Sequence, residues 1–156
     1  MDILLKRARL SDCQLIYAMQ VRAFAPLLEK YKDYDTNPGA ETFEKVKKRM
    51  EQSFTDYFLI ELGGLSIGAI RIVRNLKGIC RISPIFILPE FQGRGYAHQA
   101  IKAAEMLYPE VCRWELDTIK EEEKLCRLYE SLGYTVTGRE KELQKGMTLI
   151  YYIKQL

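Results

Sequence analysis

The sequence has few of the residues from which metal centres and disulfide frameworks are built. It contains a single histidine, His98, and its four cysteines form no Cys-x-x-Cys pair. Zinc sites draw closely spaced ligands from these two residue types, so the sequence predicts neither a metal site nor a set of disulfides. Apolar runs are short as well, and the first stretch, MDILLKRARLSD, becomes charged after three apolar residues in a row. We therefore expect no secretion signal, no membrane association and a cytoplasmic location.

An excess of charge of one sign is also missing. The 24 lysines and arginines nearly balance the 21 aspartates and glutamates, the net charge is +3, and no long basic run occurs. This pattern does not fit a nucleic-acid-binding protein. The chain has 156 residues, of which 47% are hydrophobic, and it contains no repeat, low-complexity tract or linker. We therefore expect a single domain over residues 1–156 with one sizeable core.

The spacing of hydrophobic residues predicts a mixture of strands and helices. Strands are predicted over residues 3–8, 56–62, 66–74, 79–88, 112–119, 134–140 and 147–156. Helices are predicted over 11–24, where Ser11 and Gln14 form a capping-box pattern, and over 41–53, 97–107 and 125–132. Turn signals at 63–64 and 75–78 make the strands on either side antiparallel, whereas the helix between the strands at 79–88 and 112–119 makes that pair parallel. The predicted fold class is α/β, with a single mixed, mostly antiparallel sheet of about seven strands and helices on both faces.

The segment ILPEFQGRGYAHQA, residues 87–100, places two glycines between a buried strand and a helix. The N–H groups at a helix start have no partner inside the helix, and the helix dipole makes that end positive. Glycine lets an anion approach because no Cβ atom is in the way, and Arg94 adds a positive charge. Two interpretations are open on the residues alone: a pyrophosphate cradle, or a turn that requires flexible residues. The spacing matches neither a Walker loop nor the dinucleotide-binding Gly-x-Gly-x-x-Gly.

Two motifs connect the sequence to a known family. Gln92-x-x-Gly95-x-Ala97 resembles the Gln/Arg-x-x-Gly-x-Gly/Ala signature of the GNAT family of acyl-CoA N-acyltransferases, and it lies between an apolar strand and a helix as in that family. LYESLGY, residues 128–134, is similar to the Leu-Tyr-x-x-x-Gly-Phe/Tyr ending of the family's fourth helix. The order of elements resembles the family over nearly the whole chain. The resemblance implies a central parallel pair of strands that splays apart, and an acetyl-CoA-dependent N-acetyltransferase.

The resemblance also implies where acetyl-CoA, the co-substrate, is bound. The pantetheine arm pairs in this family with the backbone of the first splayed strand, which corresponds to Ile85, Phe86 and Ile87. The pyrophosphate corresponds to N–H groups of Gln92, Gly93, Arg94, Gly95, Tyr96 and Ala97. The family carries a bulge in the first splayed strand, and Pro84 fits one, although a proline tolerated in an irregular strand explains it equally well. Where the family often has an asparagine that contacts pantetheine, seven residues before its tyrosine, this sequence has Glu122.

The catalytic residues follow from the same comparison. Tyr129 corresponds to the tyrosine that protonates the CoA thiolate, and a phenol with a pKa of about 10 can donate to a thiolate whose conjugate acid has a pKa of about 8.5. Periodicity alone would instead make Tyr129 a core aromatic residue. For the base that accepts the proton of the amine, Asp117 is the first candidate and Glu61 the second. A water chain that ends on backbone carbonyls is a third possibility.

The segment 29–44 corresponds to the wall of the acceptor site in this family. It holds five acidic residues with aromatic residues between them, and carboxylates and aromatic faces suit a cationic amine. Tyr31, Tyr34 and Asp35 are therefore predicted to bind a small cationic amine, with a solvated acidic loop as the alternative. Two other functions stay open: acetylation of protein lysine or N-terminal amines, and acyl-CoA binding without catalysis. The apolar run TLIYYI in the last strand suggests either a homodimer contact or buried core.

Overall fold

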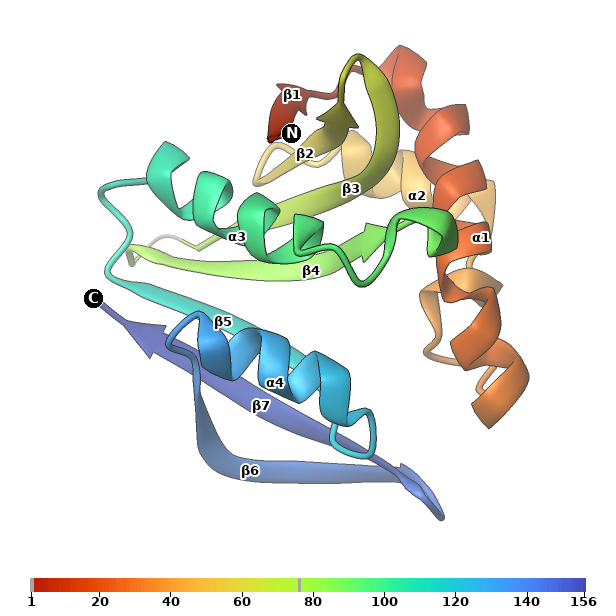
Figure 1. Cartoon of the computed structure of the whole chain (residues 1–156), viewed down its shortest axis with the longest axis vertical. Coiled ribbons are helices and arrows are strands. Elements are labelled where there is room, and N and C mark those ends of the chain that lie inside the picture. Colours follow the sequence, from red (N-terminus) through yellow and green to blue (C-terminus); the bar gives the residue numbers. More distant parts are fainter. Residues whose placement is uncertain (1, 76) are drawn as a thin grey trace.

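The computed structural model describes residues 2–75 and 77–156. Its sheet has seven strands in the order β1-β2-β3-β4-β5-β7-β6 (Figure 1). The strands are β1 (Ile3–Arg7), β2 (Thr55–Leu62), β3 (Leu65–Arg74), β4 (Ile79–Ile87), β5 (Arg113–Ile119), β6 (Thr135–Gln144) and β7 (Met147–Gln155). The helices are α1 (Cys13–Tyr31), α2 (Phe43–Met50), α3 (Tyr96–Leu107) and α4 (Glu123–Ser131). Only the β4–β5 pair is parallel among the strand pairs of the described residues, which confirms the predicted mixed, mostly antiparallel sheet.

Helices cover both faces of the sheet, as the sequence predicted (Figure 1). Successive side chains of a strand point to opposite faces, so one strand can supply two cores. On β2, Phe58 and Ile60 pack in a cluster with residues of α3 and α4. Tyr57 and Leu59 of the same strand pack in a second cluster with residues of α1 and α2. We call these two sides the α3/α4 face and the α1/α2 face.

The two parallel strands separate soon after they begin. Pairing between β4 and β5 joins Ile79, Cys80 and Arg81 to Arg113, Trp114 and Glu115, and it continues no further. Beyond these pairs β4 stays bonded to β3 up to Ile87, and β5 stays bonded to β7 up to Ile119. A gap therefore opens between the carboxyl-terminal halves of β4 and β5, and each half presents one unpaired backbone edge to it. The expected splay is present.

Helix α1 differs most from the sequence prediction. It begins at Cys13, after the 3-10 turn Leu10–Asp12, and it continues through Pro26 to Tyr31 rather than ending at Phe24. The predicted capping box at Ser11 is wrong, because the carboxylate of Asp12 accepts a hydrogen bond from the backbone N–H of Arg9 at 2.8 Å and organises the turn instead. Proline lacks the N–H that an inner helical turn uses, so local rules favour an early end. The last turn of α1 is stabilised by hydrogen bonds of Tyr31 with Glu122 and Gln144. Both partners lie far away in the sequence, so the local pattern does not predict these bonds.

The other boundaries moved less. Helix α2 is shorter than the predicted 41–53, because the side chain of Thr42 caps its start by accepting from the Lys45 N–H at 3.2 Å. Strand β6 extends beyond the predicted end at residue 140, since it pairs with β7 as far as Gln144. The predicted turn over 75–78 includes residue 76, which lies outside the described residues. None of the helices in the described ranges is long and apolar enough to cross a membrane.

Candidate active site

The loop that joins β4 to α3 leaves the start of the helix open. Gly95 is the N-cap residue, and no side chain caps the helix. The first hydrogen bond of α3 runs from the Gln99 N–H to the Gly95 carbonyl at 3.1 Å. The N–H groups of the first helical turn therefore have no acceptor within the helix. The side chain of Gln92 donates to the Ile87 carbonyl at 2.8 Å, so Gln92 ties this loop to the end of β4.

The two glycines of this loop are required by the backbone conformation. Gly93 and Gly95 have φ values of 76° and 82°, in the left-handed region that other residues avoid. A Cβ atom built on either glycine would meet nothing within 4 Å. The conformation of Gly93 and Gly95 is the one that the turn interpretation expected. The space above their backbone is also open, so an anion can approach it. A pyrophosphate fits this place, because it would meet free N–H groups, the positive end of α3 and the exposed side chain of Arg94.

The end of β4 offers backbone rather than side chains to the gap. Ile85 and Ile87 pair with Ile70 and Gly68 of β3 on one edge, so the opposite edge faces β5. The side chains of Phe86 and Ile87 are buried. A bulge interrupts this strand, because Ser83 and Pro84 together lie opposite the single residue between Ile70 and Ile72. These free strand groups fit a ligand that pairs with backbone, as the amides of pantetheine can.

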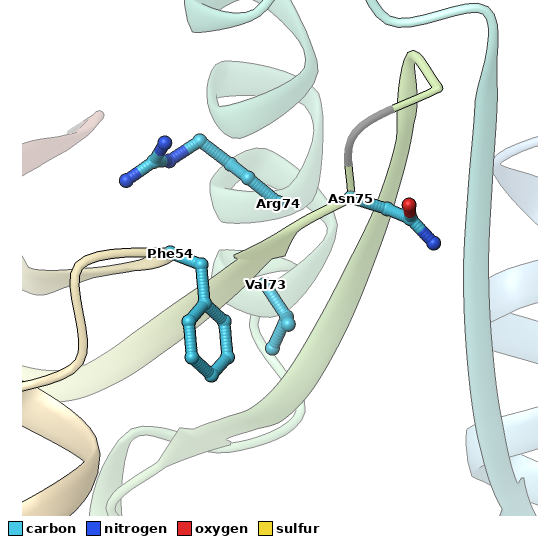
Figure 2. A pocket seen from close by; sticks show the side chains of 4 residues that line it. All are labelled: Phe54, Val73, Arg74 and Asn75. Atoms are coloured by element: carbon cyan, nitrogen blue, oxygen red, sulfur yellow. The ribbon is translucent and has the colours of Figure 1, made fainter.

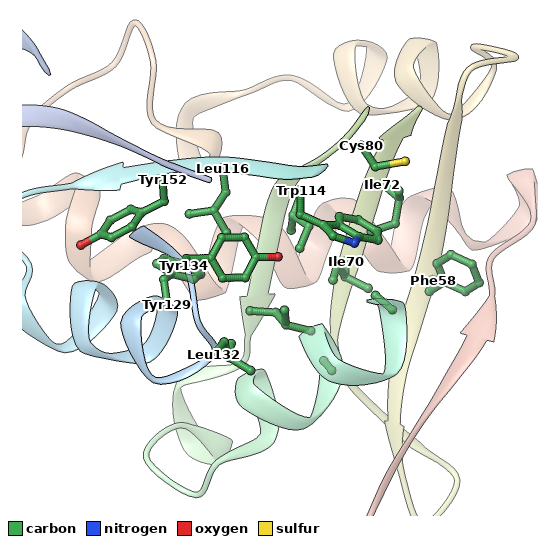
Figure 3. Close-up of a cluster of buried hydrophobic side chains, with 14 of the residues drawn as sticks. Phe58, Ile70, Ile72, Cys80, Trp114, Leu116, Tyr129, Leu132, Tyr134 and Tyr152 are labelled. Carbon is green, nitrogen blue, oxygen red and sulfur yellow. The ribbon is translucent and has the colours of Figure 1, made fainter. Parts of the chain in front are cut away.

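Tyr129 lies on α4 in the core of the α3/α4 face, where its exposed fraction is 6%. Figure 3 shows its ring next to Tyr134, with Tyr152 of β7 nearby, and the ring centroids lie 6.3 and 6.1 Å away. The hydroxyls of Tyr134 and Tyr152 donate to Glu105 and Glu130 at 2.9 and 2.7 Å. The Tyr129 hydroxyl has no hydrogen-bond partner within residues 2–75 and 77–156. Burial, with a smaller effect of Cys126, raises the pKa of Tyr129 to about 12.

The two candidate carboxylates differ in their distance from the gap. Asp117 lies on β5, in the part of the strand that no longer pairs with β4, and it forms an ion pair with Arg81 of β4. Arg81 borders a hollow of about 290 Å³ whose lining also includes Arg139 and Tyr151. Glu61 lies on β2, which β3 separates from β4 in the sheet. The structure therefore brings Asp117 to the gap and leaves Glu61 away from it.

Glu122 and Tyr31 meet at the N-terminal end of α4. The Tyr31 hydroxyl donates to the Glu122 carboxylate at 2.5 Å, and the Lys30 ammonium binds the same oxygen at 2.6 Å. These bonds offset the effect of burial and lower the pKa of Glu122, so the carboxylate is ionised at neutral pH. The side chain of Gln144 donates to the Tyr31 carbonyl at 2.7 Å. The last turn of α1 is thereby joined both to α4 and to the β6–β7 hairpin.

The remaining predicted acceptor residues are not gathered at this place. Tyr34 is exposed, with an exposed fraction of 64%, and Asp35 is also exposed. Asp33 organises the loop locally by accepting from the N–H groups of Asp35 and Thr36 at 3.2 and 3.1 Å. Glu41 forms a two-pronged ion pair with Arg49 at 2.7 and 2.6 Å. Several acids of segment 29–44 therefore have structural partners within the protein.

A larger hollow lies elsewhere on the molecule. It measures about 490 Å³ and is lined by Phe54, Val73, Arg74 and Asn75 (Figure 2). Val73 and Arg74 pair with the first residues of β4, whereas the open start of α3 follows the last residues of that strand. This hollow is therefore at the opposite end of β4 from the candidate site.

Sequence reasoning missed one residue of the site, Arg71 of β3. Its guanidinium donates to the carbonyl of Ser83, inside the β4 bulge, at 2.8 Å. An arginine within an otherwise apolar strand was the only local signal, and it does not identify the partner.

A mixed sheet that parts between two parallel strands, beside an open helix start, is the architecture of acyl-CoA-dependent acyltransferases. A family model described as "Acetyltransferase (GNAT) domain" matches residues 29–156, and the chain belongs to the GNAT family. It is accordingly an acetyl-CoA-dependent acetyltransferase. No curated protein matches the sequence.

Solved structures share the fold at low sequence identity. An acetyltransferase from Thermus thermophilus superposes with a TM-score of 0.77 at 18% identity, covering 100% of this chain and 98% of its own. A SpeG spermidine N-acetyltransferase chimera from Vibrio cholerae and hSSAT gives 0.78 at 19% identity, with coverage of 99% and 96%. RimL, a ribosomal alpha-N-protein acetyltransferase in complex with coenzyme A, gives 0.76 at 12% identity, with coverage of 100% and 95%. At such identities the likeness establishes the fold.

Proposed function

We propose that residues 1–156 act as a single domain that transfers an acetyl group from acetyl-CoA directly to a small cationic primary amine. The observation that carries this proposal is the gap between β4 and β5, which opens beside the uncapped start of α3. An acetyl donor with an anionic end and an amide-rich arm matches both features. Its anionic end fits the start of α3, and its amides fit the backbone edge of β4 in the gap. The RimL structure, which holds coenzyme A on the same fold, supports the choice of acetyl-CoA as co-substrate.

In the proposed complex, each part of the donor site has one task. The N–H groups from Gly93 to Ala97 bind the pyrophosphate together with Arg94, because the described loop and helix offer them no acceptor. The N–H of Gln92 donates to the Pro89 carbonyl at 3.2 Å, so it joins them only if that bond opens. The edge of β4 at Ile85, Phe86 and Ile87 orients the pantetheine arm, and the Ile87 carbonyl on it already accepts a hydrogen bond from the Gln92 side chain. Bound acetyl-CoA supplies the activated thioester. Glu122 is held by Lys30 and Tyr31, so a contact of its carboxylate with pantetheine requires these partners to give way.

We propose that Tyr129 donates its phenolic proton to the CoA sulfur as the C–S bond breaks. With a pKa of about 12, Tyr129 stays protonated at every physiological pH. Donation to a thiolate of ordinary basicity, with a pKa of about 8.5, is uphill by about 5 kcal/mol. The burial that raises the pKa of the phenol also disfavours a thiolate beside it, so the true difference is smaller.

We propose that Asp117 accepts the proton that the amine loses, either directly or through water. Its position beside the gap supports this role, and its ion pair with Arg81 keeps the carboxylate oriented. Asp117→Asn should reduce kcat/KM for the amine while the affinity for CoA stays unchanged. Glu115→Gln on the same strand is the matched control. Equal activities of Asp117→Asn and the parent protein would leave the water chain as the base.

The acceptor class rests on the carboxylate of Glu122. It already binds one primary ammonium, that of Lys30, while the same ammonium lies 5.2 Å from the centre of the Tyr31 ring, and an acceptor ammonium would take the place of Lys30. Carboxylate and aromatic ring together form the surroundings that a cationic amine requires. The bonds of Tyr31 to α4 and to the β6–β7 hairpin join the last turn of α1 to both elements, which favours a small acceptor over an extended peptide. Tyr34 and Asp35 remain proposed acceptor residues as exposed side chains of the loop that follows α1.

A panel of amines assayed with acetyl-CoA tests the acceptor class. We expect turnover of small amines that carry a second positive charge, and weaker turnover of neutral analogues of the same length. Acetylation of peptides alone would favour the protein acetyltransferase alternative. Binding of CoA without turnover of any amine or peptide would favour the non-catalytic alternative.

We also propose that two copies of the chain associate through the bare face of β7. Ile150 and Tyr152 point into the core, whereas Leu149, Tyr151 and Ile153 alternate with them and are only partly buried. The apolar run is therefore divided between core and surface. A spermidine N-acetyltransferase of the same fold forms a dodecamer, which supports association in this architecture. Sedimentation equilibrium should give a mass above that of one chain, and Tyr151→Glu should restore a monomer.

A further inference from the structure

Arg71 is a buried cation without a carboxylate partner. Its exposed fraction is 9%, and no ion pair to it occurs within the described ranges. One guanidinium nitrogen donates to the Ser83 carbonyl at 2.8 Å and another to the side chain of Gln52 at 3.1 Å. The third nitrogen, Nε, is buried and has no partner among the described residues. Burial accordingly lowers the pKa of Arg71. A charge kept under such unfavourable conditions needs a specific reason.

The reason is in the shape of β4. Arg71 is the β3 residue that faces the bulge, between the pairs Ile70 with Ile85 and Ile72 with Ile82. A bulge leaves backbone groups outside the ladder. The Ser83 carbonyl is such a group, and it accepts a hydrogen bond from the Arg71 side chain on the α1/α2 face rather than from a backbone N–H of the neighbouring strand.

The bulge determines how the following residues are presented. A shift of one residue in a strand exchanges its two faces and moves its backbone groups along the edge. Ile85, Phe86 and Ile87 come directly after the bulge and form the free edge of the gap. If the bulge relaxed, the donors and acceptors on this edge would no longer match a bound ligand.

We propose that Arg71 is a positioning residue for acetyl transfer, which fixes the β4 bulge through the Ser83 carbonyl and thereby aligns the strand edge that holds the reacting end of the donor. This inference rests on the proposed binding of acetyl-CoA along β4. The planar guanidinium spans two acceptors at once, Ser83 on β4 and Gln52 in the loop after α2. Lysine could serve only one of them with comparable geometry.

Arg71→Met and Arg71→Lys test the proposal, with Arg49→Met as the matched control. Arg49 is also partly buried on the α1/α2 face, but its partner is Glu41 and it makes no contact with the bulge. We expect Arg71→Met to lower kcat about tenfold or more with little change in KM for acetyl-CoA, because alignment is lost while binding of the pyrophosphate at the open start of α3 is retained. Arg71→Lys should recover part of the loss. Arg49→Met should lower the melting temperature and leave kcat close to that of the parent.

Amide hydrogen exchange at Ile85 and Phe86 supplies a second readout that needs no turnover. These amides should exchange at least about tenfold faster in Arg71→Met or Arg71→Lys than in the parent protein and in Arg49→Met. The inference is overturned if folded Arg71→Met keeps both the parent kcat and the parent exchange rates, or if kcat falls equally in both methionine variants. If the parent turns over no amine, the proposed function fails, and the exchange rates still decide whether Arg71 holds the bulge. If Arg71→Met does not fold, Arg71→Lys and Gln52→Leu carry the test.

Discussion

Replacing Tyr129 by phenylalanine separates catalysis from packing more cleanly than any other change in this chain. Tyr129→Phe removes one oxygen atom and keeps a ring that packs 6.3 and 6.1 Å from two other aromatic rings. Because the hydroxyl has no hydrogen-bond partner in the described ranges, its loss leaves no described group unsatisfied. We expect the free energy of unfolding to change by less than about 1 kcal/mol.

The expected effect on kcat is much larger. A positioned general acid contributes about 100-fold to 10,000-fold to a rate, so kcat should fall by at least about 100-fold. The uphill proton transfer from a phenol with a pKa of about 12, about 5 kcal/mol, is compatible with the barrier of about 16 kcal/mol at ten turnovers per second. Since this phenol ionises only near pH 12, kcat of the parent should show no alkaline decline up to about pH 10.

The assay measures free CoA released from acetyl-CoA at saturating amine, with melting temperatures taken on the same preparations. Tyr134→Phe is the matched control, because it removes the hydroxyl that donates to Glu105 at 2.9 Å from the neighbouring ring. That variant should lose about 1 kcal/mol of stability and keep the parent kcat. The reasoning is refuted if Tyr129→Phe keeps the parent kcat, or if the two variants lose activity equally.

Three further outcomes follow from the structure. Gly95→Ala should raise KM for acetyl-CoA and lower the free energy of unfolding by about 1 kcal/mol. Gly64 has a similar φ of 84° and equally open space, so Gly64→Ala should show the same loss of stability in a thermal melt and leave KM unchanged. Asp56→Asn should lower the free energy of unfolding by about 1–3 kcal/mol in urea titrations. The reason is that the buried Asp56 carboxylate accepts hydrogen bonds from Arg7, Arg74 and Tyr108. A smaller loss would mean that the exposed arginines are fully rehydrated. The pKa of Tyr129 is higher in the folded chain, so its stabilisation is complete below about pH 10 and is lost as the pH rises through about 12, by roughly 3 kcal/mol. Because burial also raises the pKa of Tyr108, Tyr134 and Tyr152, the share of Tyr129 is the difference between urea titrations of the parent and of Tyr129→Phe at pH 9 and 11, and an equal loss in both proteins would contradict the assignment.

The fold and the open start of α3 were predictable from local patterns. Alternating apolar residues located the strands, and the helix between 79–88 and 112–119 required the parallel pair. The two glycines before α3 indicated the open helix start, because their conformational need is local. Boundaries that depend on distant partners were predicted less well. Helix α1 passes Pro26 and reaches Tyr31, whose hydroxyl bonds with Glu122, 91 positions away.

The charge pairs around the proposed acceptor site depended on tertiary contacts. In the sequence, Glu122 is only a departure from a family pattern, and segment 29–44 is only a stretch rich in acidic residues. In the folded chain Glu122 forms an ion pair with Lys30, and Glu41 forms one with Arg49. The pairing of Arg71 with the Ser83 carbonyl and that of Arg81 with Asp117 likewise join different strands. The sequence by itself determined the order of elements, the open start of α3 and the class of reaction, since these depend on neighbouring residues. Only the tertiary structure decided which charges are free and which are paired, because a charge is satisfied by whatever group the fold brings within a few ångströms.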